Sequence, residues 1–528
     1  MDLIDWTVIG VFLCLLIGLS IYVGRGQTGQ DDYYVGGRNL SWWAVGISTM
    51  ATQTSAVSFI SIPAFVALKP QGGLTWIQYE LAVPLAMIAA SILLVPLFRK
   101  LRLISVYEYL ELRFGPSMRT LVSAIFLLSR AFGTSVGLYA SAIVLAVVMQ
   151  VPIWTTILLM GGFTVVYDAI GGMKAVVYSD VFQALILFAG IFVCIYYAVG
   201  DLGGIGATLD LIPRERLNTL DLSVGLVDGS QTPFWGFLIG AFFLYLAYYG
   251  TDQSQVQREL SARTLEDTRK SLFLNGYVRF PLATLYLGLG LALGGFYITV
   301  PEFRNEVPAD LMDFLVPVFV LHHLPSGVRG LLVAALLAAS MSSLDSALNS
   351  LSAVTMRDFV ERRHTPSQRT SLWLGRLTTL LWGLLVTAFA FAVGNIADTV
   401  IESINKVGST VYGPILAAFL VGVLSRRATT AAIFAGVLTG VGLNLYLWLA
   451  HPGIFWMWWN LFGLLAAVLT TWVVSHFTRP RAGVELAPYT LDGSGLYAEL
   501  PVWSRGHSLL LIYFFLILGI VIAIDLSV

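Results

Sequence analysis

Long apolar runs are the feature of this 528-residue chain that most limits what it can fold into. A bilayer core about 30 Å thick is crossed by a helix of about 20 apolar residues. Only 12% of the residues are charged, against about 25% in an ordinary soluble domain, so a soluble enzyme, a disordered chain and a nucleic-acid binder are poor fits. The pattern predicts an all-α integral membrane protein with about fourteen transmembrane helices, at 3–23, 42–68, 76–98, 120–149, 152–167, 175–199, 234–250, 271–299, 329–353, 372–393, 400–423, 428–450, 456–477 and 508–526.

Lys and Arg positions predict which loops face the cytoplasm, because basic residues concentrate on that side. Alternate loops hold 22 of the 30 basic residues, and the loops between them hold five: Lys69, Arg214, Arg216, Arg304 and Arg329. If the basic set is cytoplasmic, both termini are extracytoplasmic. The segment 3–23 is interpreted as a retained span, because no small-residue cleavage site follows it. We therefore expect a multi-pass protein of the cell membrane, plasma or inner, with the lipid bilayer as a partner.

Motifs of several other function classes are missing. The chain has no GxxxxGK[ST], HExxH or CxxC, and Cys14 and Cys194 both lie in apolar runs, which excludes a disulfide framework. No Ser or His spacing argues for a nucleophile, so we expect no enzyme activity, no organic cofactor, no nucleic-acid partner and no obligatory protein partner. Transport driven by an ion gradient is the remaining common function for so many spans. The segment 309–322 is expected to be a helix at the outer surface.

Six stretches go beyond composition and occur in one order along the chain. The stretches are YYVGGRNLSWWAVGISTMATQTSAVSF (33–59), SVYEYLELRFG (105–115), YDAIGGMKAVVYSDVFQ (167–183), YYGTDQSQVQREL (248–260), SSLDSALNSLSAVTMRDF (342–359) and NKVGSTVYGPILAAFLVG (405–422). Together they resemble the sodium:solute symporter family, which includes symporters for glucose and galactose, proline, sialic acid, vitamins and iodide. The resemblance covers about residues 30 to 425.

The resemblance implies the LeuT-type fold, a core of two inverted five-helix repeats. It divides the chain into a peripheral helix and loop, a first repeat, an extracellular loop, a second repeat and three peripheral helices, at 1–41, 42–199, 200–233, 234–423 and 424–528. The first helix of each half interrupts its apolar run with polar residues at depth, and such interruptions at matching positions indicate a binding site at the bilayer midplane. The polar residues are Thr49, Thr52, Gln53, Thr54 and Ser55 in one half and Tyr245, Tyr248, Tyr249 and Gly250 in the other.

The family's shared sodium site maps onto five residues of this chain. The resemblance implies that Na⁺ is the coupling ion, held by the backbone carbonyls of Ala51, Thr54 and Ala339 and by the hydroxyls of Ser342 and Ser343. A desolvated sodium ion needs about five or six hard oxygen ligands. The residue types agree with that requirement.

A further cation site is implied at Asp180, where some members of the family have an acid facing hydroxyls of the partner helix. Ser346 matches one of those hydroxyls, but Asp345 replaces another, so this position could strengthen ion binding, hold a proton or form a salt bridge. An acid inside the membrane costs about 2.5–3.5 kcal/mol on insertion scales, which favours a role. The alternative is that Asp180 is a helix N-terminal acid stabilised by the dipole.

Eight residues are candidates for substrate binding. By resemblance to sugar symporters of the family, Glu80, Tyr245, Arg279 and Lys406 take the positions of sugar ligands, Ser58 replaces an amide ligand, and Tyr248 closes the pocket towards the cytoplasm. The full set is Gln53, Ser55, Ser58, Glu80, Tyr245, Tyr248, Arg279 and Lys406. Half of the polar ligands differ from the family's sugar site, which puts a galactose-like substrate in doubt.

Three cations lie at membrane depth in the predicted helices. Arg279 cannot easily reach the interface and needs an anion, either Glu80 or a substrate carboxylate. Lys406 has Glu402 one turn before it, in the favourable order for an i,i+4 pair, or it contacts substrate. Arg130 is the third, and no family role is carried over to it.

These observations predict a sodium-coupled secondary symporter that imports a small polar organic solute by alternating access. The solute is an organic acid or a sugar or polyol. One alternative is a proton-coupled symporter of the same fold, and a less favoured one is a membrane receptor or sensor module.

Overall fold

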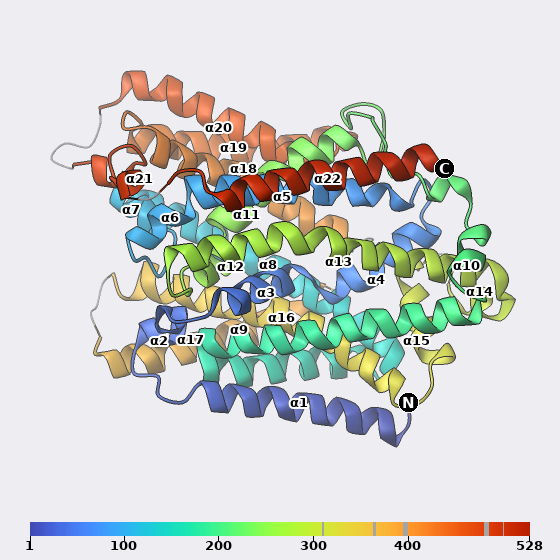
Figure 1. Cartoon of the computed structure of the whole chain (residues 1–528). Helices are drawn as coiled ribbons and strands as arrows, with labels where there is room; N and C mark the ends of the chain where they lie inside the picture. The colour runs from blue at the N-terminus through green and yellow to red at the C-terminus, as the bar shows by residue number, and fades with distance from the viewer. Residues whose placement is uncertain (309–310, 363–365, 394–399, 480–484, 500) are drawn as a thin grey trace.

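Helices packed side by side along one axis make up most of the described molecule (Figure 1). The computed structural model describes residues 1–308, 311–362, 366–393, 400–479, 485–499 and 501–528. Within these ranges the only β-pairing is an isolated bridge between Leu40 and Ala262. Both termini lie at the same end of the helix bundle.

The longer helices correspond to the apolar runs of the sequence. They are α1 (Leu3–Val23), α3 (Trp42–Gln53), α4 (Ala56–Leu68), α5 (Ala82–Leu93), α8 (Pro116–Met149), α9 (Ile153–Asp201), α11 (Ala241–Thr251), α13 (Leu265–Thr299), α16 (Val328–Val354), α17 (Gln368–Val393), α18 (Val400–Leu424), α19 (Thr430–Ala450), α20 (Trp458–Phe477) and α22 (Arg505–Ser527).

Short helices connect or extend these elements. The α-helical ones are α2 (Gln30–Val35), α6 (Val95–Lys100), α7 (Glu108–Phe114), α10 (Ile205–Leu211), α12 (Gln253–Glu259), α14 (Pro301–Glu306), α15 (Leu315–His323) and α21 (Leu496–Glu499). The 3₁₀ and π segments are η1 (Gly36–Arg38), η2 (Leu74–Leu81), η3 (Arg214–Arg216), η4 (Gly236–Gly240), η5 (Met312–Phe314), η6 (Thr355–Val360) and η7 (Ala487–Tyr489).

The number of spans differs from the fourteen expected. By length and composition, 11 helices of the described chain can cross a membrane, or 12 when the bent pair of α3 and α4 is taken as one span. The expected spans 152–167 and 175–199 both fall within α9, and the expected span 234–250 falls in an apolar stretch, Gly236–Thr251, that is shorter than a full crossing. The predicted count of fourteen is therefore not confirmed.

A kink at Gly172 separates the two predicted spans within α9. A continuous helix of 49 residues would be about 74 Å long, more than twice the thickness of a bilayer core. Gly172 has φ +55° and ψ −154°, so the helix axis changes direction at this residue. A side chain there would also meet Tyr33, since a Cβ atom would lie 2.6 Å from the Tyr33 carbonyl oxygen.

The predicted interruption in 42–68 is present as a break between α3 and α4, which meet at 58°. Thr54 has a ψ of 82°, which takes its carbonyl out of the helical hydrogen-bond ladder. The Ser55 hydroxyl accepts a hydrogen bond from the Ser58 amide at 3.3 Å and so caps α4. Backbone freed at membrane depth is tolerated only where protein or a cavity surrounds it.

The second break lies further along the chain than predicted. α11 stays helical through Tyr245, Tyr248 and Tyr249 and ends at Thr251, and the chain turns at Asp252, whose ψ is 124°. The Asp252 side chain accepts a hydrogen bond from the Ser254 amide and caps α12. The expectation of an unwound segment at the tyrosines is wrong, because these aromatic residues are buried on a regular helix.

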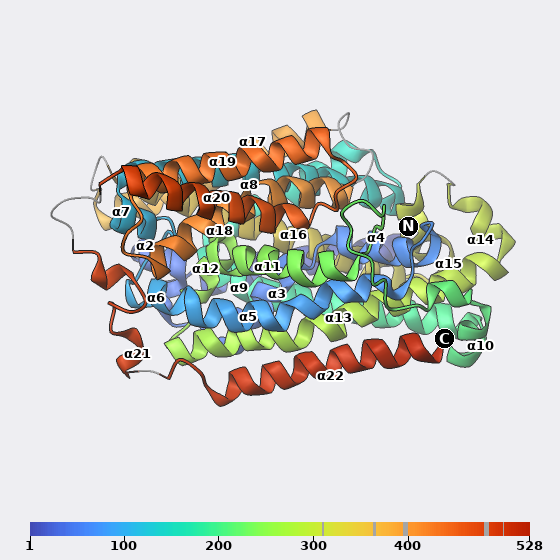
Figure 2. The same ribbon diagram turned by 90° about the horizontal axis from the view of Figure 1, so that it is seen from above.

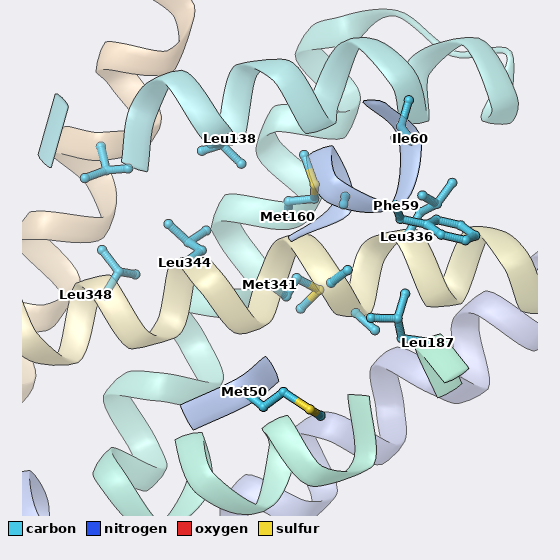
Figure 3. Close-up of a cluster of buried hydrophobic side chains, with 14 of the residues drawn as sticks. Met50, Phe59, Ile60, Leu138, Met160, Leu187, Leu336, Met341, Leu344 and Leu348 are labelled. Atoms are coloured by element: carbon cyan, nitrogen blue, oxygen red, sulfur yellow. The ribbon is translucent and has the colours of Figure 1, made fainter. Parts of the chain in front are cut away.

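α16 lies at the centre of the bundle and is buried along nearly its whole length. Figure 3 shows its apolar side chains, among them Leu336, Met341 and Leu344, facing neighbours from several other helices, such as Leu138 and Leu187. Seen from above, α22 runs along one edge of the bundle, and α17 and α19 run along the other (Figure 2). The helix expected within 309–322 forms as α15, although six of its nine residues are buried; residues 309–310 lie outside the described part of the chain.

Candidate ion- and solute-binding site

The break between α3 and α4 borders a cavity of about 260 Å³. Side chains from η2, α8, α11, α13, α16 and α18 complete its wall. Six of the eight predicted substrate residues line it: Gln53, Ser55, Ser58, Glu80, Tyr248 and Arg279. Its walls combine aromatic and aliphatic side chains with a limited set of polar groups, which is typical of a small-molecule site.

Arg279 and Glu80 form a bidentate ion pair in this wall. The Arg279 Nε donates to Glu80 Oε2 at 3.1 Å, and its Nη2 donates to Oε1 at 2.7 Å. Tyr245 accepts from the same Nη2 at 3.4 Å, and its ring stacks on Tyr79 at 5.0 Å between centroids. Tyr245 is fully buried and does not line the cavity, so it contacts Arg279 from behind.

Two tyrosines of α11 are held by amide side chains. Tyr249 donates from its hydroxyl to Gln53 Oε1 at 2.6 Å, which ties α11 to the end of α3. The Tyr248 hydroxyl accepts from Gln255 Nε2 at 2.8 Å. The Tyr248 ring faces Tyr412 of α18 at 6.0 Å between centroids. This arrangement places Tyr248 in the cavity wall, where the resemblance had put the residue that closes the pocket.

Arg130 of α8 pairs with Asp252 at the second helix break. Its Nη2 also donates to Ser254 Oγ at 2.8 Å, and its guanidinium lies 5.7 Å from the centre of the Tyr248 ring. The Tyr412 hydroxyl donates to Asp252 Oδ2, the same oxygen that Arg130 contacts, at 3.2 Å. Sequence reasoning singled out Arg130 without a partner and did not single out Asp252. The available signal was an acid directly after a transmembrane tyrosine run.

Lys406 is half-buried on α18 and is not among the cavity-lining residues. The next two residues, Val407 and Gly408, do line the cavity. The side chain of Glu402, the alternative partner, lies outside the described residues.

Three of the five predicted sodium ligands, Ala51, Ala339 and Ser342, have oxygens that meet between the end of α3 and the middle of α16. The Ser342 hydroxyl lies 3.4 Å from the Ala51 carbonyl oxygen and 3.1 Å from that of Ala339. The Ser343 hydroxyl donates to the Thr52 carbonyl at 3.0 Å. These are hard, uncharged oxygens on two helices, one of which ends at this point, with Thr54 as its C-cap.

This donor set fits a monovalent ion. Sodium takes hydroxyl and carbonyl oxygens, and a site with no carboxylate holds it without trapping it. No group of three or more His, Cys, Asp or Glu side chains that could hold a metal ion occurs in the described part of the chain. Bound here, Na⁺ would supply a positive charge that joins α3 to α16.

A cluster of buried charges lies one turn further along α16. Asp180 Oδ2 accepts from the Ser48 hydroxyl at 2.5 Å and from Arg258 Nη2 at 3.2 Å, and Arg258 also contacts the hydroxyl of Ser346. The guanidinium thus lies between two of the residues expected to form the further cation site. Asp180, Arg258 and Ser346 are essentially inaccessible to solvent. Arg258 was not singled out from the sequence, although it lies within the quoted stretch 248–260.

Asp345 has its own set of donors beside this cluster. Its Oδ2 accepts from the Tyr167 hydroxyl at 2.6 Å and from Ser179 at 3.4 Å, and its Oδ1 lies 3.1 Å from the Ser346 hydroxyl. Asp168 is also fully buried, with one carboxylate oxygen bonded to Asn349 at 3.3 Å.

This chain is similar to known membrane transporters over most of its length. The model of the sodium:solute symporter family matches residues 33–440. The sodium/iodide cotransporter of Homo sapiens is 30% identical and covers 84% of this chain and 69% of its own length. The sodium/sialic acid symporter NanT of Aliivibrio fischeri is 28% identical and covers 90% of this chain and 93% of its own length. The solved structure of a sodium-coupled sialic acid symporter in a substrate-bound, outward-open state matches with a TM-score of 0.83 and 23% identity, covering 91% of this chain and 99% of that one.

The structural likeness establishes the fold, and the match to the family model extends over most of the chain. This chain therefore belongs to the sodium:solute symporter family and is a sodium-coupled membrane transporter rather than an enzyme.

Proposed function

We propose that the transporter imports a small polar organic solute together with sodium by alternating access. The solute classes under consideration are organic acids and sugars or polyols. The observation that carries this proposal is the cavity at the α3–α4 break, which lies directly beside the serine and carbonyl oxygens of the α3–α16 junction. Ser343 belongs to both, because its hydroxyl bonds the end of α3 and its side chain lines the cavity.

The ligand set proposed for sodium is the backbone carbonyls of Ala51, Thr54 and Ala339 with the hydroxyls of Ser342 and Ser343. Sodium at this point would hold α3 against α16, and so would stabilise the shape of the cavity that accepts solute. Coupling requires that sodium bind this state more tightly than the others, since a ligand shifts an equilibrium only by its differential affinity. Gln53, Ser55, Ser58, Glu80, Tyr248 and Arg279 are proposed to contact solute, with Tyr245 positioning Arg279. Lys406 remains a candidate contact.

A second candidate function is proton coupling in the same fold. The observation that favours it is a group of three fully buried carboxylates, those of Asp168, Asp180 and Asp345. Among them, Asp180 forms an ion pair with Arg258. Unbalanced charge at this depth is unfavourable, so a proton or a cation is needed there. We propose that Arg258 takes the place of a second cation at Asp180 and Ser346.

The division into inverted repeats at 42–199 and 234–423, with peripheral helices at 1–41 and 424–528 and a loop at 200–233, is likewise proposed. The distribution of basic residues supports extracytoplasmic termini in the cell membrane. Both termini lie at the same end of the bundle, as this orientation requires.

Uptake into proteoliposomes tests the proposal. An inward sodium gradient should drive uptake, and Ser343→Ala should weaken the dependence on sodium at unchanged protein level. Ser340→Ala is the matched control, because Ser340 lies on the same helix and lines the cavity but its hydroxyl bonds the Leu336 carbonyl within α16. Uptake that is unchanged when choline replaces sodium overturns sodium coupling. Uptake driven by a pH step without sodium favours the proton-coupled alternative.

A further inference from the structure

The charged side chains that line the solute cavity form two ion pairs. In the described wall these are Glu80 with Arg279 and Asp252 with Arg130. The Glu80 and Asp252 side chains are 4% and 2% exposed, and the Arg279 and Arg130 side chains are 10% and 19% exposed. Two positive and two negative groups leave the wall with no net formal charge.

Because each arginine is already paired with a carboxylate, neither offers an unpaired positive charge to the solute. An organic acid needs a cation that is not already neutralised. To pair with Arg279, a solute carboxylate would have to displace Glu80 and leave that carboxylate buried without a counter-charge, which is strongly unfavourable. Asp252 creates the same obstacle at Arg130. An uncharged solute can form hydrogen bonds at the edges of either pair without separating its charges.

Tyr286 adds an independent observation on the same wall. It lies seven residues after Arg279 on α13, two helical turns along the same face, and it lines the cavity. Its hydroxyl is buried and has no hydrogen-bond partner among the described residues. A buried hydroxyl without a partner is unfavourable, so an oxygen of a bound solute would supply the missing hydrogen bond.

We propose that the cavity selects an uncharged solute carrying hydroxyl or amide groups over an organic acid, and that Tyr286 is a specificity-determining residue of this site. This inference rests on the proposed function and narrows its solute class. The sequence left open whether Arg279 pairs with Glu80 or with a substrate carboxylate, and the structure gives both Arg279 and Arg130 carboxylate partners within the protein.

The test is thermal unfolding of the purified full-length protein with pairs of compounds that differ in one acid group. The probes are glucose with glucuronate, lactamide with lactate, and pantothenol with pantothenate, each measured in sodium chloride and in choline chloride. In sodium, at least one uncharged probe should raise the Tm measurably more than its acid counterpart does. The inference is overturned if no uncharged probe raises the Tm, or if in every pair that changes the Tm the acid raises it as much as or more than its uncharged counterpart.

The Tm measured with sodium and without any probe distinguishes a failure of this inference from a failure of the proposed function. A rise in Tm with sodium chloride over choline chloride supports the sodium site whichever probes bind. If sodium stabilises the protein and the acids are preferred, only the solute class is wrong. If sodium has no effect, sodium coupling fails.

Two variants refine the test. Glu80→Gln removes the carboxylate from Arg279 and should shift preference towards the acid member of a pair by about tenfold, equivalent to about 1.4 kcal/mol. Tyr286→Phe should weaken binding of the uncharged probe about tenfold and leave the effect of sodium alone unchanged. Tyr297→Phe is the control, since Tyr297 lies on the same helix outside the cavity, against Arg304. Equal binding by Tyr286→Phe and the unmodified protein would remove Tyr286 from the site.

Discussion

Arg258→Met is the substitution with the clearest consequence for the buried charges. Arg258 is 0% exposed and contacts Asp180, Ser48, Ser346 and the Ser254 carbonyl. Methionine keeps much of the side-chain length and removes the charge. Removing one member of a buried ion pair destabilises a protein by about 3–5 kcal/mol, because the other charge is left uncompensated.

The double variant isolates the pair itself. Asp180→Asn added to Arg258→Met removes both charges, and replacing a buried pair by uncharged groups is often nearly neutral. We therefore expect the double variant to regain most of the stability that Arg258→Met loses. The difference between the sum of the single effects and the double effect measures the coupling.

Thermal unfolding in detergent at one fixed scan rate is the assay, with variants compared by the order of their Tm values because unfolding of such proteins is often irreversible. Lys270→Met is the control: Lys270 pairs with Glu266 across one turn at 3.8 Å, and the two side chains are 48% and 65% exposed. An exposed pair of this kind contributes about 0.3–0.5 kcal/mol. A double variant no more stable than Arg258→Met alone would refute the reasoning, as would a loss of equal size in Lys270→Met.

Further predictions concern backbone geometry and the end of α16. Gly172→Ala should destabilise the protein by at least about 1 kcal/mol, because φ is positive there and the new methyl would meet Tyr33. The control is Gly162→Ala, which has open space around it and should leave the Tm unchanged or raise it. Asp358→Asn should lower stability by about 3 kcal/mol, since the buried Asp358 carboxylate pairs with Arg119 at 2.6 Å; an unchanged Tm would contradict this.

The positions of most helices could be predicted from the sequence, because an apolar run long enough to cross a bilayer has few other stable structures. Gly172 bends α9 in the gap between the two predicted spans, 152–167 and 175–199. The prediction failed at the second helix break, which Asp252 places after the tyrosines rather than within them. The position of that break does not change hydropathy, so the apolar pattern did not reveal it.

Much of the candidate site could also be predicted, by resemblance rather than by pattern. Gln53, Ser55, Ser58, Glu80, Tyr248 and Arg279 line one cavity as expected of contacting residues. Their roles remain proposals. Asp252, Arg258 and Tyr286 were not predicted, because an acid at a helix break, an arginine in a polar stretch and a tyrosine in an apolar helix each have ordinary structural explanations.

By itself, the sequence determined that this chain is a membrane protein built from helices, because hydropathy and helix formation depend on residues close together in the chain. The transport function followed from the resemblance of six stretches to a known family. Only the tertiary structure decided which charges meet. Arg279 finds Glu80 across 199 residues, and Arg258 finds Asp180 across 78. A buried charge requires a partner, but several are available within the membrane, and the packing of the helices determines which one lies within reach. That packing pairs Arg279 with Glu80 and Arg130 with Asp252.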